Sequence, residues 1–226
     1  IVPPFSITDP IGQPAFYTDN GASHVDFPFG INNILVTGID IGTPSDNRVV
    51  AYVLMAELQN STGALTLSSV TAAFGSMQIA EQRTSQIGNT SLSAIVFQNI
   101  PTGTTTQSVF TFSTNIQHLT FGCYSIYGAQ QLSPVDTEGN SGIITARNVV
   151  FGGFAGSVTL LGGTASNTAA VNLPSWANAT QDFIASNLDP PPPYLYNTGA
   201  SRTNISSAPQ SYYLTNCNTI VGAVWR

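Results

Sequence analysis

The chain has 226 residues, of which 42% are hydrophobic and only 7% are charged, and its net charge is −6 with a pI near 4.4. This length suits one large all-β domain with a sizeable core, whose surface must be neutral and polar. An acidic chain without a lysine repels phosphate backbones, and no apolar run approaches the roughly 20 residues of a membrane-spanning helix, so neither nucleic acid nor a membrane is an expected partner.

The first 14 residues predict an extended arm, because prolines alternate with single apolar residues and prevent a helix. Such a segment either docks on a neighbouring subunit or protein, or covers its own domain. The remaining residues, 15–226, are predicted to form a single domain. The arm residues expected to bind a partner are Pro3, Pro4, Phe5, Ile7 and Ile11.

Short strands are predicted at close intervals after the arm, each bounded by Asn, Gly or Pro. They cover residues 16–17, 24–29, 34–41, 48–58, 65–73, 77–83 and 91–98. The segment 48–58 carries apolar residues on both faces, which predicts a central strand buried between two layers.

Residues 107–130 predict a long hairpin around which the chain is organised. Two alternating strands are joined by turn-forming residues at Asn115, Ile116 and Gln117. Gly122 and Cys123 are too small to fill space, so the hairpin needs a second layer packed over it. Further strands are predicted at residues 143–146, 149–154, 168–173 and 219–225.

Many short strands separated by frequent turns predict an all-β fold: a two-sheet antiparallel β-sandwich of jelly-roll type with an extended Pro-rich N-terminal arm. Residues 175–184 fit a short helix, a strand or an irregular loop. Residues 187–210 contain four consecutive prolines and predict a long exposed loop with a stiff polyproline segment.

Several motifs occur in an order that resembles a family of β-sandwich virion proteins of tailed bacteriophages. They are RVVAYV at Arg48, LSSVTAAFG at Leu67, SAIVFQNIPTGTTTQSVFTFS from Ser93, FGCYSIYGAQ from Phe121, an Asp136-Thr137 pair, VVFGGFAG from Val149 and the final VGAVWR. The motifs consist of turns and core positions, and together they cover most of residues 46–226.

This resemblance implies a non-enzymatic structural component of the phage particle: a head spike, capsid decoration or tail-fibre subunit at the virion surface. Its partners would be other virion proteins and copies of itself. Strands with few charges and no lysine are poorly guarded against edge pairing, which also favours a homo-oligomer.

Catalysis is not expected, because the chain lacks the nucleophile-elbow and zinc-protease motifs, and no cofactor is predicted. His24 and Asp26 are two residues apart, so they share one strand face and can touch, but a polar surface pair without a catalytic role is expected. His118 lies on a different predicted strand.

No metal site is predicted either. Asp136, Glu138 and Asn140 space oxygen ligands at alternate positions, as a calcium loop does, but the downstream glutamate of that motif is missing, so a polar connection between strands is expected. The two cysteines, Cys123 and Cys217, are read as buried free thiols, with a disulfide as the alternative.

The alternative function is a carbohydrate-binding module that recognises host surface glycans. Aromatic faces beside neutral amides suit sugar binding, because rings stack and amides donate and accept hydrogen bonds. Tyrosines flank the Pro-rich segment, and the same residues could equally pack at the edge of the core. They are Tyr194, Tyr196, Tyr212 and Tyr213.

Overall fold

The computed structural model describes residues 15–58, 63–86, 90–167, 173–187, 194–204 and 206–226, with the backbone alone at 143–145, 166–167, 187 and 194–195. The predicted arm, residues 1–14, lies outside these ranges. Every regular element in the described chain is a β-strand, which confirms the all-β prediction. The described residues contain no helix of the length and apolarity needed to cross a membrane.

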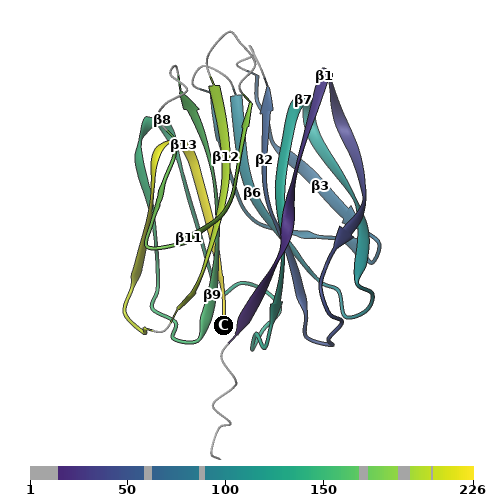
Figure 1. Cartoon of the computed structure of the whole chain (residues 1–226), viewed down its shortest axis with the longest axis vertical. Coiled ribbons are helices and arrows are strands. Elements are labelled where there is room, and N and C mark those ends of the chain that lie inside the picture. Colours follow the sequence, from purple (N-terminus) through teal and green to yellow (C-terminus); the bar gives the residue numbers. More distant parts are fainter. Residues whose placement is uncertain (1–14, 59–62, 87–89, 168–172, 188–193, 205) are drawn as a thin grey trace, which may run out of the picture.

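The strands form two antiparallel sheets, each built from one half of the chain (Figure 1). The N-terminal sheet has seven strands in the order β4-β3-β7-β2-β6-β5, with β1 paired to β7. Its strands are β1 (Phe16–Asp40), β2 (Val49–Leu58), β3 (Leu67–Ala72), β4 (Gly75–Ser76), β5 (Gln78–Ser85), β6 (Thr90–Asn99) and β7 (Thr105–Tyr127).

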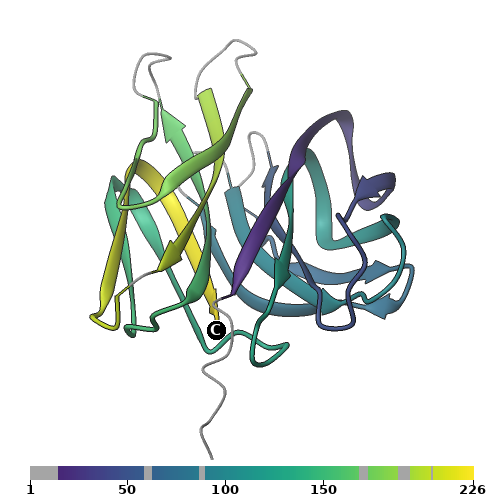
Figure 2. The same ribbon diagram turned by 60° about the horizontal axis from the view of Figure 1, so that its bottom comes forward.

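The C-terminal sheet has six strands in the order β10-β13-β9-β12-β11, with β8 paired to β13. Figure 2 shows the two sheets side by side, the purple-to-teal strands of one facing the green and yellow strands of the other. The strands of the C-terminal sheet are β8 (Asp136–Phe151), β9 (Ser157–Asn167), β10 (Trp176–Ala177), β11 (Thr180–Asn187), β12 (Tyr194–Asn204) and β13 (Gln210–Trp225).

The predicted hairpin at residues 107–130 is wrong: β7 is one continuous strand of 23 residues. β1 pairs along most of its length, β3 pairs with its first part and β2 with its second part. Ile116, expected in the turn, is fully buried in the core and aligns with Ile31 of β1. Burial of this side chain outweighs the turn preference of its neighbours Asn115 and Gln117.

β2 is buried on both faces, as predicted, because it separates two cores. Its even-numbered side chains, such as Tyr52 and Leu54, point into a core enclosed by the curled N-terminal sheet. Its odd-numbered side chains, such as Val53 and Met55, meet Leu160 and other residues of the C-terminal sheet in a central core between the sheets. A third core lies within the C-terminal sheet.

Small residues let the two sheets approach closely. A Cβ atom on Gly162 of β9 would lie 2.5 Å from Val53 Cγ1 of β2, and one on Gly122 of β7 would lie 2.3 Å from the ring of Phe183 in β11. The glycines of β7 and β9 therefore lie where the two sheets pack against each other.

The structure decides one open prediction for the C-terminal half and corrects another. Residues 175–184, left open between helix, strand and loop, form β10 and the start of β11. The predicted exposed loop at residues 187–210 is largely strand: β12 occupies 194–204 and lies between β9 and β11. Its residues 196–201 are buried, and Tyr196 and Ala200 pack in the third core. Residues 188–193, with the four prolines, lie outside the described ranges.

Candidate functional site

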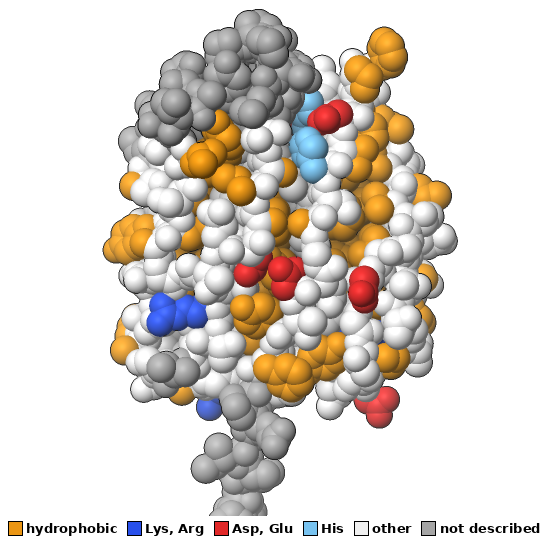
Figure 3. All heavy atoms as spheres, in the orientation of Figure 1, with side chains coloured by type: hydrophobic (Ala, Val, Ile, Leu, Met, Phe, Trp, Pro, Cys, Tyr) orange, Lys and Arg blue, Asp and Glu red, His pale blue; other side chains and the backbone are white. Residues whose placement is uncertain are grey.

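Three ionisable side chains from two strands converge at one end of the inter-sheet face. His24 and Asp26 of β1 lie opposite Thr120 and His118 of β7 in the strand register. Asp26 Oδ1 lies 2.9 Å from His24 Nε2 and 2.7 Å from His118 Nδ1. The two imidazole rings are nearly parallel, with centroids 6.3 Å apart. In Figure 3 the chain's only two histidines gather beside a carboxylate on the face shown.

A second layer of polar groups holds His24 in place. His24 Nδ1 lies 2.7 Å from Thr120 Oγ1, and Asn197 Nδ2 of β12 donates to the same hydroxyl at 3.1 Å. Thr120 and Asn197 are both buried. The arrangement fixes the ring orientation and leaves Nε2 directed at Asp26.

A buried carboxyl lies next to this group. Glu57 of β2 pairs in register with His118 on one side and with Ser91 on the other, so Asp26, His118 and Glu57 form one row across three strands. Residues opposite each other on neighbouring antiparallel strands point to the same face. Glu57 is 0% exposed, and neither of its carboxyl oxygens has a hydrogen-bond partner.

The pKa values of the two carboxyl groups in this row are shifted in opposite directions. Burial, reinforced by the nearby charge of Asp26, raises the pKa of Glu57 to about 8. Burial also acts to raise the pKa of Asp26, but the hydrogen bond from His118 and the charges of both histidines outweigh it and lower that pKa below its ordinary value. Glu57 is therefore kept neutral while Asp26 stays ionised.

A second acid, partly buried, lies farther along the same interface. Asp182 of β11 accepts hydrogen bonds from Tyr124 and Ser201, at 2.8 and 3.0 Å. Burial, which outweighs these hydrogen bonds, raises the pKa of Asp182. Both oxygens of this carboxyl are used within the fold, which fits a structural link between the sheets.

The predicted glycan-binding tyrosines do not form one surface. Tyr196 is 1% exposed and Tyr212 is 0% exposed, so both belong to the core and cannot stack on a sugar. Tyr213 is 42% exposed, because it points to the other face of β13. The side chain of Tyr194 lies outside the described structure. The packing alternative is correct for Tyr196 and Tyr212.

Asp136, Glu138 and Asn140 lie on strand β8, where the sequence predicted a loop. Their oxygens accept local hydrogen bonds: Asp136 from the amide of Gly152, just after the strand, Glu138 from the Val150 amide and Asn140 from Arg147. β8 bends back on itself, so side chains at its start accept hydrogen bonds from groups at its end.

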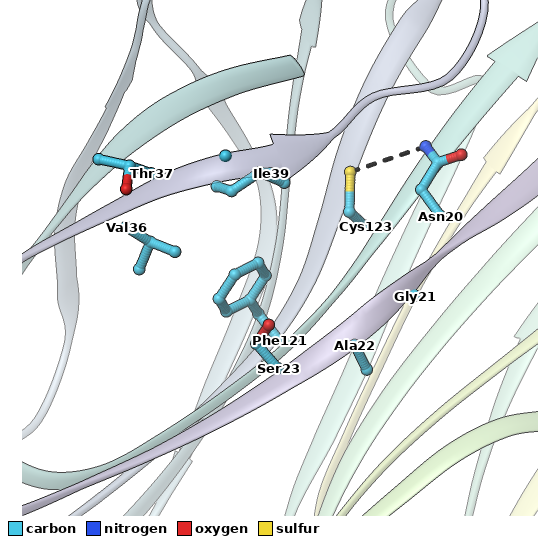
Figure 4. A pocket seen from close by; sticks show the side chains of 10 residues that line it. Asn20, Gly21, Ala22, Ser23, Val36, Thr37, Ile39, Phe121 and Cys123 are labelled. Atoms are coloured by element: carbon cyan, nitrogen blue, oxygen red, sulfur yellow. Dashed lines mark hydrogen bonds between the residues drawn. The ribbon is translucent and has the colours of Figure 1, made fainter. Parts of the chain in front are cut away.

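Neither cysteine forms a disulfide and both are buried, as predicted. Cys123 lies in a pocket of about 140 Å³ between two segments of β1, together with Phe121 (Figure 4). Asn20 Nδ2 approaches its sulfur at 3.8 Å. Burial raises the pKa of the Cys123 thiol to about 12, so it stays protonated and is a poor nucleophile.

β1 exposes apolar side chains along its length. Phe29 is 96% exposed and Leu35 is 59% exposed, and Val25 and Ile31 are each 37% exposed. Phe29 lies where the register with β7 shifts, next to Gly30, whose φ of +70° favours glycine. β1 pairs with β7 alone within the described residues, so it is an edge strand.

Near the start of β1, Phe16 stacks on Tyr127 with ring centroids 5.1 Å apart. This pair lines an open groove of about 400 Å³ with Thr18, Thr43 and Ser45. Phe16 is 54% exposed. The groove therefore offers an aromatic face beside neutral hydroxyls.

Comparisons of the chain with protein-family models, curated proteins and solved structures find no match. The assignment of a candidate site is therefore supported by the geometry of its residues alone. Sequence reasoning found the His24–Asp26 contact but missed His118 and Glu57. The only sign of these two residues in the sequence was that each is a polar residue in an otherwise apolar strand.

Proposed function

We propose that this chain is a non-enzymatic structural subunit that acts by assembly and surface display, as a head spike, capsid decoration or tail-fibre component of a tailed-phage particle. The order of its motifs supports the phage assignment, since it resembles β-sandwich virion proteins. The jelly-roll subtype and the Pro-rich arm stay predictions that belong to the same proposal.

The observation that carries an assembly role is the apolar, uncharged outer strand. Residues 27–39 of β1 include no charged side chain, yet they expose Phe29 and Leu35. Natural edge strands are usually guarded by charges, especially lysine, and this one is not. Because two copies could meet here without charge repulsion, we propose a second copy of the chain as the partner of this surface.

A test of this proposal replaces Phe29 with serine. The wild-type chain is expected to form a discrete oligomer, and Phe29→Ser is expected to weaken association at least about tenfold, since a large exposed aromatic ring is a typical interface anchor. Light scattering coupled to size-exclusion chromatography reports the mass. Phe74→Ser is the matched control, because Phe74 is 48% exposed but lies in the turn between β3 and β4. Equal masses for wild type and Phe29→Ser would contradict the proposal.

The second candidate is recognition of a host surface glycan, and the Phe16–Tyr127 groove is the observation that favours it. The groove pairs a stacked aromatic surface with hydroxyl groups, which suits a sugar ring. Binding on a glycan array that Phe16→Ala abolishes would favour this function, and an array without binding would argue against it.

A further inference from the structure

His24, Asp26 and His118 have the spacing of metal ligands. One ligand atom from each residue can be chosen so that all three lie within 4.8 Å of one another. Ligands of a tetrahedral zinc ion lie about 2.1 Å from the metal and so about 3.4 Å apart. The present separations of 2.9 and 2.7 Å from Asp26 Oδ1 require only a small outward shift of that carboxylate.

The hydrogen bonds around His24 suit a metal ligand. When an ion takes the place of the Nε2 proton, a neutral imidazole that donates from Nδ1 to Thr120 presents the lone pair of Nε2 to that ion. Thr120 Oγ1 can accept this bond and the one from Asn197 together, because a hydroxyl has two lone pairs. Metal-binding histidines typically have such a partner on their other ring nitrogen.

Glu57 provides an independent indication of a cation. Its carboxyl group is fully buried, has no hydrogen-bond partner and lies in register beside His118. An unpartnered buried carboxyl is costly for a fold, and a cation bound nearby would lower the cost of ionising it. Within the described structure, the row therefore has a place for positive charge.

The site is also open to solvent on one side. The side chain of Asp26 is 57% exposed and that of His24 is 25% exposed, whereas His118 is 7% exposed. An ion can therefore enter past Asp26 and reach the buried ring.

We propose that His24, Asp26 and His118 bind a divalent transition-metal ion, with the buried carboxyl of Glu57 next to His118 in the same row. Two imidazoles and a carboxylate favour zinc and its neighbours over calcium or magnesium. The ion would fasten edge strand β1 to β7, and this site is independent of the proposed assembly role.

The wild-type chain allows a direct test, because it contains only these two histidines. Ring nitrogens of ¹⁵N-histidine-labelled protein are followed by NMR while zinc is added. One equivalent is expected to shift the signals of His24 Nε2 and His118 Nδ1 in the same titration. Ring signals that stay unchanged in excess zinc would overturn the proposal.

A matched pair of variants tests the carboxylate by calorimetric titration with zinc. Asp26→Asn is expected to weaken zinc binding about 100-fold or more, as loss of a ligand should exceed the 10–100-fold effect of an outer partner. Glu138→Gln is the control, since Glu138 lies on β8 and accepts from a backbone amide. Equal affinities for wild type and Asp26→Asn would overturn the assignment.

Cobalt(II) distinguishes these ligands from the two thiols. Thiolate ligands give an intense near-ultraviolet charge-transfer band, and the proposed site predicts a cobalt spectrum without it. Such a band would assign the ion to Cys123 or Cys217 and overturn the proposal.

Discussion

Replacing Arg48 with methionine is expected to destabilise the protein by about 4 kcal/mol or more, enough to threaten folding in a typical domain. Arg48 is 0% exposed. Its guanidinium donates four hydrogen bonds of 2.8–2.9 Å to the carbonyls of Gly42, Ile100, Thr102 and Gly103. Methionine fills a similar volume but removes the donors of all four carbonyls, and the loss is most costly at the buried carbonyl of Ile100.

Urea unfolding measures this effect. Arg83→Met is the matched control, because Arg83 is 44% exposed and its ion pair with Glu81 spans 3.4 Å at the surface. That change is expected to stay within about 0.5 kcal/mol. Arg48→Lys should fall between the two, since an ammonium group cannot reach four carbonyls in a fixed plane. Similar stabilities for Arg48→Met and Arg83→Met would contradict the role of Arg48.

Replacing Glu57 with glutamine is expected to stabilise the metal-free protein, with a gain that depends on pH. Glutamine resembles the protonated acid in shape and charge. The pKa of Glu57 is raised from 4.5 to about 8 in the folded chain, so between these values the native state holds a proton that the unfolded state has lost. Wild-type stability therefore falls as pH rises through this window, whereas the variant lacks this loss.

The expected gain from Glu57→Gln is on the order of 3 kcal/mol near pH 7, at about 1.4 kcal/mol for each unit between the unfolded pKa and the pH. It should vanish below about pH 4 and level off above about pH 8. The titratable groups that share the row are Asp26 and His118. Chemical unfolding across this range, with a chelator present, measures the gain. A stability difference that does not change with pH would show that Glu57 is not held neutral by the fold.

The strand content was predictable because alternation and turn residues are local signals. β2 was identified as a buried central strand from its continuous apolar run, and buried thiols were inferred because Cys123 lies in the middle of a strand. Long-range pairing was not predictable. β7 continues through Asn115 and Gln117 because β1 covers both of its halves, and a pairing partner far away in the chain decides this.

The candidate site likewise has one contact that is local in the sequence and one that depends on long-range pairing. His24 and Asp26 are two residues apart, so their contact follows from strand geometry alone. Asp26 and His118 are 92 residues apart, and only the register of β1 with β7 brings them together. The tyrosine surface failed for a related reason: residues around the prolines were read as a loop, but β12 is a strand between two others, which buries Tyr196.

The measurement that tests the assembly account most directly is the solution mass, by sedimentation equilibrium, of the full chain and of a chain that starts at Ala15. We expect a discrete oligomer for the full chain and a monomer for the shortened one, because removal of residues 1–14 takes away Phe5, Ile7 and Ile11. If both chains are monomers, assembly through the arm and through β1 is wrong.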